Sequence, residues 1–213
     1  ILFNARFIVF VSPSYLDVVK ENFGETFFNE IISPKVRIIG NIINSCWFSG
    51  ISQKSPPVDT IRLIYFGEFS KNKRIESLIR AYDILDESID LTLTLIGNYG
   101  DNCKRIERMA SQRRGVRVVN KIDDTSVLIE LIDNHDIFVM PSKTETFGMA
   151  YVEAMSRGLP LIYTKGQGID GFFPDGSVGY SVSEPIENSI VTRVLDIRKN
   201  YDVLSAQAQM LSK

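Results

Sequence analysis

Residues 136–163, DIFVMPSKTETFGMAYVEAMSRGLPLIY, contain the stretch that decides the fold. The segment 136–140 is mostly apolar and short, as is typical of a buried strand in a parallel sheet. A helical pattern begins at Gly148, and Gly158 ends it just before a second apolar strand at 161–163. The stretch therefore predicts strand, loop, helix and strand, which is the repeating unit of a parallel α/β sheet.

Two carboxylates flank the expected start of this helix. Glu145 lies in the loop, and Glu153 follows eight positions later, within the first two helical turns. Between them, Phe147, Gly148 and Met149 present backbone N–H groups at a helix N-terminus, where anions bind readily. Carboxylates accept hydrogen bonds from hydroxyl groups, and free amides bind phosphate oxygens. The pattern predicts a site for a polyhydroxyl ligand that carries a phosphate.

Each of these residues also has a purely structural interpretation. Glu153 and Arg157 are spaced as an i,i+4 pair, so Glu153 could simply support its helix. Glu145 could cap the helix or lie in solvent, and Gly148 could merely mark a loop. The combination is more specific than any single residue.

That combination resembles the motif of two glutamates separated by seven residues in retaining glycosyltransferases with the GT-B fold, in particular glycosyltransferase family 4. The family pattern runs roughly P-S-x-x-E-x-F-G-x-x-x-x-E-A-x-x-x-G-x-P. The chain matches it in register at Pro141, Ser142, Glu145, Phe147, Gly148, Glu153, Ala154, Gly158 and Pro160. The resemblance implies a doubly wound, Rossmann-like parallel α/β sheet, the nucleotide-sugar half of a GT-B fold.

The resemblance also implies roles for individual residues. Glu153 would bind the ribose hydroxyls and Glu145 the hydroxyls of the donor sugar. The amides of Phe147, Gly148 and Met149 would meet the sugar or phosphate. The donor would be a UDP- or GDP-linked sugar, transferred with retention of configuration. No cofactor and no metal would be required, because helix N-termini and a lysine would stabilise the diphosphate leaving group.

The lysine is expected in a second loop. The strand 61–66 ends at Gly67, and a basic cluster that includes Lys73 and Arg74 precedes the next helix. Cations are disfavoured at a helix N-terminus, and a bound diphosphate would offset that mismatch; the alternative is a solvated loop. The family pattern is G-R-x-x-x-x-K-G. Gly67 and Lys73 match it, whereas Glu68 replaces the arginine and Arg74 the glycine. Lys73, with Glu145, is the expected catalytic residue, and Arg74 is suggested as a second charge by proximity alone.

Two other features complete the expected site, and the single histidine is not part of it. The loop after the strand 116–119 would cover the nucleobase, chiefly through backbone groups at Ile122, although that side chain could merely pack. The glycine-rich segment 164–171 would border the sugar and acceptor. His135 is the single histidine, and its position at a helix end predicts a packed rather than a catalytic side chain.

Composition limits the alternatives. The chain has 213 residues, 44% of them hydrophobic, enough for one domain or for one domain and part of another. The net charge of −2 and the pI near 5.6 argue against a nucleic-acid partner. Cys46 and Cys103 do not require a disulfide, which favours a reduced, cytoplasmic setting. No apolar run approaches the ~18 residues of a membrane span.

The chain divides into two expected units. Residues 1–52 resemble the last elements of an N-terminal acceptor domain plus a linker. They include an apolar strand at 5–11, a helix that Ser12 could cap, and the turn at Asn41. Residues 53–213 form the C-terminal nucleotide-sugar-binding domain. Because the chain begins with an isoleucine directly before an apolar strand, we expect a fragment of a longer protein, whose missing part would bind a glycan or lipid-linked acceptor and could associate with the inner face of the membrane.

The expected function is glycosyl transfer in the biosynthesis of a surface polysaccharide, such as a capsule, or of another glycan. Alternatives are another GT-B enzyme, such as a nucleotide-sugar epimerase or a glucan synthase, and a non-catalytic sugar-nucleotide-binding module. A structural domain that has lost its ligand is a further alternative, suggested by Glu68 in place of arginine.

We predict that the purified 213-residue chain binds nucleotide but transfers little or no sugar, because acceptor recognition would lie on the missing domain. A transfer assay with radiolabelled donor measures this, and turnover by the purified chain would contradict it.

Overall fold

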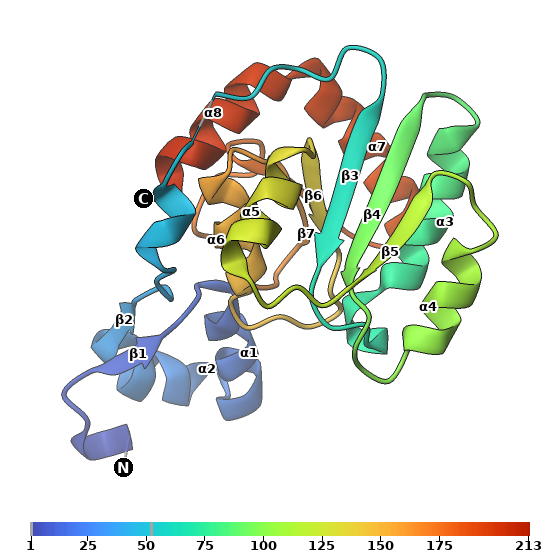
Figure 1. The fold of residues 1–213 in the computed structure, drawn as a ribbon. Helices are drawn as coiled ribbons and strands as arrows, with labels where there is room; N and C mark the ends of the chain where they lie inside the picture. Colours follow the sequence, from blue (N-terminus) through green and yellow to red (C-terminus); the bar gives the residue numbers. More distant parts are fainter. Residues whose placement is uncertain (1, 52) are drawn as a thin grey trace.

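The computed structural model describes residues 2–51 and 53–213. Ile1 and Ser52, the ends of the first expected unit, lie outside the described residues. The described chain contains two parallel sheets, one of two strands and one of six (Figure 1).

The larger sheet has the strand order β5-β4-β3-β6-β7-β8, and all its neighbours are parallel. This is the strand order of the Rossmann fold, so the expected doubly wound parallel α/β sheet is confirmed. The strands are β3 (Ile61–Phe66), β4 (Leu91–Gly97), β5 (Val116–Asn120), β6 (Ile137–Met140), β7 (Leu161–Thr164) and β8 (Gly179–Val182).

Helices cover both faces of this sheet, with α3, α4 and α7 on one face and α5, α6 and α8 on the other (Figure 1). Every residue of β6 and β7 is buried, as expected for strands covered on both faces. The helices are α3 (Ile75–Asp86), α4 (Cys103–Ala110), α5 (Thr125–Asp133), α6 (Met149–Ser156), α7 (Ile186–Lys199) and α8 (Tyr201–Leu211). No helix in the described ranges combines the length and the hydropathy that crossing a bilayer requires.

The order of the strands determines where a site can form. The chain leaves β3 toward β4 on one side, and leaves β6 toward β7 on the other, although β3 and β6 are neighbours. Ligands of such sheets bind at this switch point, where the loops diverge at the carboxyl edge. The loops concerned are residues 67–74 and 141–148.

The smaller unit precedes the linking segment. It contains η1 (Leu2–Asn4), β1 (Ile8–Phe10), α1 (Ser14–Phe23), α2 (Glu25–Phe27), η2 (Phe28–Ile32), η3 (Ser33–Lys35) and β2 (Val36–Ile38). The prediction that Ser12 caps the helix is wrong. The helix begins at Ser14, with Pro13 at the cap position. Ser12 Oγ instead donates to Thr146 O at 2.5 Å, and Ser14 Oγ donates to Gly168 O at 3.1 Å. These hydroxyls join the small unit to loops of the larger sheet.

Residues 45–51 and 53–60 form what is called here the linking segment, which has an irregular backbone apart from the short helix η4 (Ser45–Phe48). It is nevertheless held firmly. Burial lowers the pKa of Lys54 to about 8, so the ammonium form predominates at neutral pH. Its Nζ donates to Asp133 O at 2.5 Å and to His135 O at 2.8 Å.

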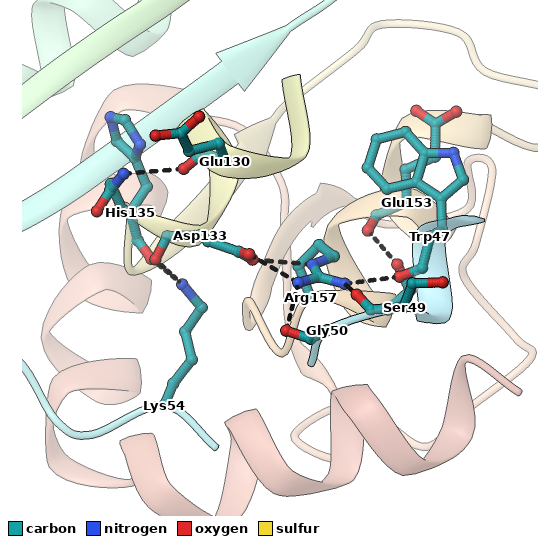
Figure 2. A network of polar contacts seen from close by, with 11 residues as sticks. Trp47, Ser49, Gly50, Lys54, Glu130, Asp133, His135, Glu153 and Arg157 are labelled. Atoms are coloured by element: carbon teal, nitrogen blue, oxygen red, sulfur yellow. Dashed lines mark hydrogen bonds and ion pairs between the residues drawn. The ribbon is translucent and has the colours of Figure 1, made fainter. Parts of the chain in front are cut away.

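A second anchor is Arg157, whose side chain is only 2% exposed (Figure 2). Its guanidinium contacts both carboxylate oxygens of Asp133, at 2.8 and 2.7 Å. It also donates to the carbonyl oxygens of Trp47, at 2.9 Å, and Ser49, at 2.8 Å. The linking segment is therefore fastened to the C-terminal end of α6.

We predict that Arg157→Ala lowers the free energy of unfolding by about 3 kcal/mol or more, because it leaves a carboxylate and buried carbonyl groups without their partner. Arg105→Ala is the matched control. Its ion pair with Glu76 is also 2.8 Å long, but the arginine side chain is 56% exposed, so its loss should cost at most about 1 kcal/mol. Urea denaturation measures both. Equal losses in the two variants would contradict the anchoring role.

Candidate functional site

An ion pair lies at the switch point. Lys73, from η5 (Lys71–Lys73), places its Nζ 2.5 Å from Oε2 of Glu145, which follows β6. The two side chains are 18% and 15% exposed. They line a cavity of about 440 Å³, called here the Lys73 cavity. Its other lining residues are Val11, Asn41, Phe66, Gly67, Glu68, Tyr99, Met140, Thr146, Phe147, Gly148, Met149 and Ala150.

The start of α6 lies against the same cavity. Gly148 occupies the N-cap position with φ +80°, and no described side chain caps the helix there. A Cβ on Gly148 would lie 2.5 Å from Cδ2 of Tyr151, so only glycine fits without displacing that ring. The first turn therefore presents backbone N–H groups that no side chain covers, which is the arrangement that binds anions.

The backbone of Glu145 is held from the other side by the glycine-rich loop. The Glu145 N–H donates to Oε1 of Gln167 at 3.0 Å, and the Gly168 N–H donates to Glu145 O at 2.8 Å. The glycine-rich loop therefore lies beside the Glu145 loop. The hydrogen bond from the Glu145 backbone to Gln167 was not predicted, because the prediction for that loop was based on its glycines alone.

A second cavity, of about 380 Å³, contains Glu153 and is called here the Glu153 cavity. Ile122, from the loop after β5, lines it too. The two cavities share Phe66, Gly67, Tyr99, Met149 and Ala150, so they adjoin at the end of β3 and the start of α6. Each is of the size typical of small-molecule sites.

Glu153 is half-buried, and this burial raises the pKa of its carboxyl group. The alternative of an ion pair with Arg157 is not what the structure has. Arg157 contacts Asp133 instead. Figure 2 shows the Glu153 carboxylate directed away from the guanidinium. The carboxylate is therefore available to its cavity.

Arg74 is the predicted site residue that the structure does not bring to either cavity. It adopts a left-handed conformation with φ +51° immediately before α3, and its Nη2 lies 2.8 Å from Oε1 of Glu184. Its side chain thus reaches the loop before α7. The left-handed conformation explains why glycine suits this position. Proximity to Lys73 in sequence did not reveal the backbone turn between them.

His135 is buried, as predicted. Its Nδ1 lies 2.7 Å from Leu131 O and its Nε2 lies 2.8 Å from Oγ1 of Thr94. Burial lowers the pKa of the imidazole, which keeps it neutral. Over residues 2–51 and 53–213, histidine, cysteine and acidic side chains form no group of three that could hold a metal ion.

Tyr99 and Val11 line the Lys73 cavity and were not predicted. Tyr99 follows β4, and its place at the carboxyl edge of the sheet was the signal that could have indicated it. Val11 comes from the small N-terminal unit, so only the packing of that unit on the larger sheet brings it to the site.

The sequence is similar to a known protein family and to characterised proteins. The sequence model of the family described as Glycosyl transferases group 1 matches residues 51–211. The chain is 25% identical over 143 residues to the N-acetyl-alpha-D-glucosaminyl L-malate synthase of Bacillus anthracis, an alignment that covers 66% of this chain and 37% of that protein. The chain thus spans a little over a third of that relative's length.

Solved structures share the fold. The sucrose-phosphate synthase of Thermosynechococcus elongatus superposes with a TM-score of 0.76 at 22% identity, over 99% of this chain and 54% of the other. The pneumococcal O-GlcNAc transferase GtfA, solved with UDP and GlcNAc, gives a TM-score of 0.71 at 20% identity, over 98% of this chain and 42% of the other.

The raised pKa of Glu153 makes a prediction about stability. At a pH below the unfolded value, near 4.5, the carboxyl is neutral in both states. As pH rises above that value, the unfolded chain ionises first, so the folded state loses stability through the raised pKa. We therefore expect the free energy of unfolding of Glu153→Gln to increase relative to that of the wild type as pH rises from about 4 to 7. Denaturant unfolding of both proteins at each pH measures this difference. The exposed Glu130→Gln serves as control, and a parallel pH-dependent gain there would contradict the assignment.

Proposed function

The chain belongs to the family Glycosyl transferases group 1, and on this basis we propose that it forms the nucleotide-sugar donor site of a glycosyltransferase. The observation that carries the proposal is the Lys73–Glu145 ion pair beside the uncapped start of α6, at the switch point of the sheet. A cation, a carboxylate and backbone amides thus meet in one cavity.

The donor's diphosphate would occupy the Lys73 cavity. In the unliganded protein Lys73 neutralises Glu145 at 2.5 Å. A diphosphate would take Lys73 as its counter-ion and also accept hydrogen bonds from the amides that begin α6. Glu145, relieved of its partner, would then accept hydrogen bonds from the sugar hydroxyls.

The nucleoside would occupy the adjoining Glu153 cavity. Glu153 would accept from the ribose hydroxyls, and the loop at Ile122 would cover the base. Gly67 lines both cavities, which suits a ligand that passes from one to the other. The structure of GtfA with UDP and GlcNAc supports a donor of this kind on the same fold.

The reaction we propose is glycosyl transfer with retention of configuration and no required metal. Negative charge that develops on the departing diphosphate would be stabilised by Lys73 and by the amides of the α6 N-terminus, which lies against the same cavity. Glu145 would orient the sugar through its hydroxyls. We do not assign it the role of a nucleophile in a glycosyl-enzyme intermediate.

We also propose that residues 53–213 act as the donor domain, and that the full-length protein uses a glycan or lipid-linked acceptor. This would place its reaction in surface polysaccharide or glycan biosynthesis, on the cytoplasmic side of the membrane. The family membership supports these proposals without specifying the sugar or the acceptor.

We predict that UDP or GDP and their sugars stabilise the chain, by about 2.7 kcal/mol at 100 times the dissociation constant. A thermal-shift panel of UDP, GDP, ADP and the corresponding sugars measures this. Lys73→Ala should abolish most of the shift, whereas Lys71→Ala, an exposed lysine of the same short helix that lines neither cavity, should not. The absence of a shift with every nucleotide would overturn the proposed function.

Glu68 favours a second candidate, a module that binds the donor weakly and does not transfer it. Glu68 lines the Lys73 cavity, so that cavity has two acidic residues and one lysine in its lining. We predict that Glu68→Arg tightens diphosphate binding about tenfold, since it exchanges a repulsive charge for a charge-assisted hydrogen bond. Calorimetric titration measures the change, and unchanged affinity would mean that Glu68 does not face the diphosphate.

A further inference from the structure

A single asparagine joins the two loops of the switch point. The Asn72 side chain donates from Nδ2 to Thr144 O at 2.8 Å. Its Oδ1 accepts from the Thr144 N–H at 3.0 Å and from Thr144 Oγ1 at 2.6 Å. The Asn72 backbone carbonyl also accepts from the Lys143 N–H at 2.7 Å. These four contacts, called here the Asn72 clamp, bridge positions 71 or 72 residues apart.

The geometry of the clamp resembles strand pairing. One side-chain amide bonds both the N–H and the C=O of Thr144, as the C=O and N–H of an opposite residue do in an antiparallel sheet. This fixes the position of one loop relative to the other. The residues that follow Asn72 and Thr144 directly are Lys73 and Glu145, the members of the ion pair.

We propose that Asn72 is a positioning residue of the donor site, and this inference rests on the proposed function. Asn72 lines neither cavity, so it acts through the residues that follow the clamp. It holds the loop of Lys73 beside the loop of Glu145, at the cavity that the start of α6 also lines.

The ion pair cannot maintain this alignment by itself. When a diphosphate takes Lys73 and a sugar takes Glu145, their mutual contact weakens. The Asn72 clamp involves neither charged group, so it persists in the liganded site. The clamp holds the Glu145 backbone from one side, and the contacts of Gln167 and Gly168 hold it from the other. Groups aligned before binding cost less free energy to order when the ligand arrives.

The first experiment tests the clamp in the unliganded chain, and so does not depend on the proposed function. In hydrogen exchange, the Thr144 amide should exchange about tenfold faster in Asn72→Ala, because its acceptor is the Asn72 side chain. The Lys143 amide should change less, because its acceptor is the Asn72 backbone carbonyl, which the variant keeps. Amides of β3 and β6 should be unchanged. Asn22→Ala is the matched control, since Asn22 makes a single side-chain bond, to Val18 O within α1. Unaltered exchange at Thr144 would overturn the proposal.

The second experiment separates positioning from general stability. Binding of UDP and of uridine, or of GDP and guanosine if the wild type prefers guanine, is measured by calorimetry and NMR titration. Asn72→Ala should weaken the diphosphate about tenfold while the nucleoside affinity changes less than about twofold. Thr144→Val, which loses only the hydroxyl contact, should weaken the diphosphate by a smaller factor.

Combination with Lys73→Ala shows whether Asn72 works through the lysine. In that background, Asn72→Ala should add little further loss of diphosphate affinity, because the group that it positions is gone. Equal losses for nucleoside and diphosphate, or full additivity with Lys73→Ala, would overturn the inference. A wild type that binds no diphosphate would instead overturn the proposed function, so the two failures are distinguishable.

Discussion

The parallel pairing of β3 with β6 is the constraint on which the site depends. In register, Leu63 is opposite Ile137 and Ile64 is opposite Phe138, and all four side chains are fully buried. Because the chain turns away from these strands in opposite directions, their following loops diverge and leave a cleft at the carboxyl edge. Lys73 and Glu145 come to lie 2.5 Å apart through this pairing, although 72 residues separate them in the chain.

The Arg157–Asp133 and Lys73–Glu145 ion pairs differ in burial, and their surroundings suggest different roles. Arg157 is 2% exposed, with carbonyl oxygens as well as Asp133 satisfying its donors, so it has no capacity for a ligand. Lys73 is 18% exposed and borders a cavity, and its only described side-chain acceptor is Glu145. A fully satisfied pair stabilises a structure, whereas a pair that can exchange partners at small cost suits a binding site.

Local patterns in the sequence predicted the sheet and named several residues that line the two cavities. Buried strands are continuous apolar runs, and the spacing of Glu145 and Glu153 follows from one loop and two helical turns. What the sequence did not reveal depends on distant partners. Arg74 does not line either cavity, because its left-handed backbone conformation redirects its side chain. Asn72 was not predicted, because its partner, Thr144, lies 72 positions away in the chain. Polar side chains that serve the backbone of another loop carry no local signal.

The Lys73 cavity is also lined by residues from both sides of the linking segment. Val11 and Asn41 line the Lys73 cavity, and Ser12 donates to the Thr146 carbonyl, one residue after Glu145. A wall of the site therefore comes from the small unit, and its placement depends on how the linking segment is held. Arg157 fastens that segment at the end of α6 opposite Gly148. One short helix thus presents its first amides to the cavity and anchors, at its other end, the chain that carries the remaining wall.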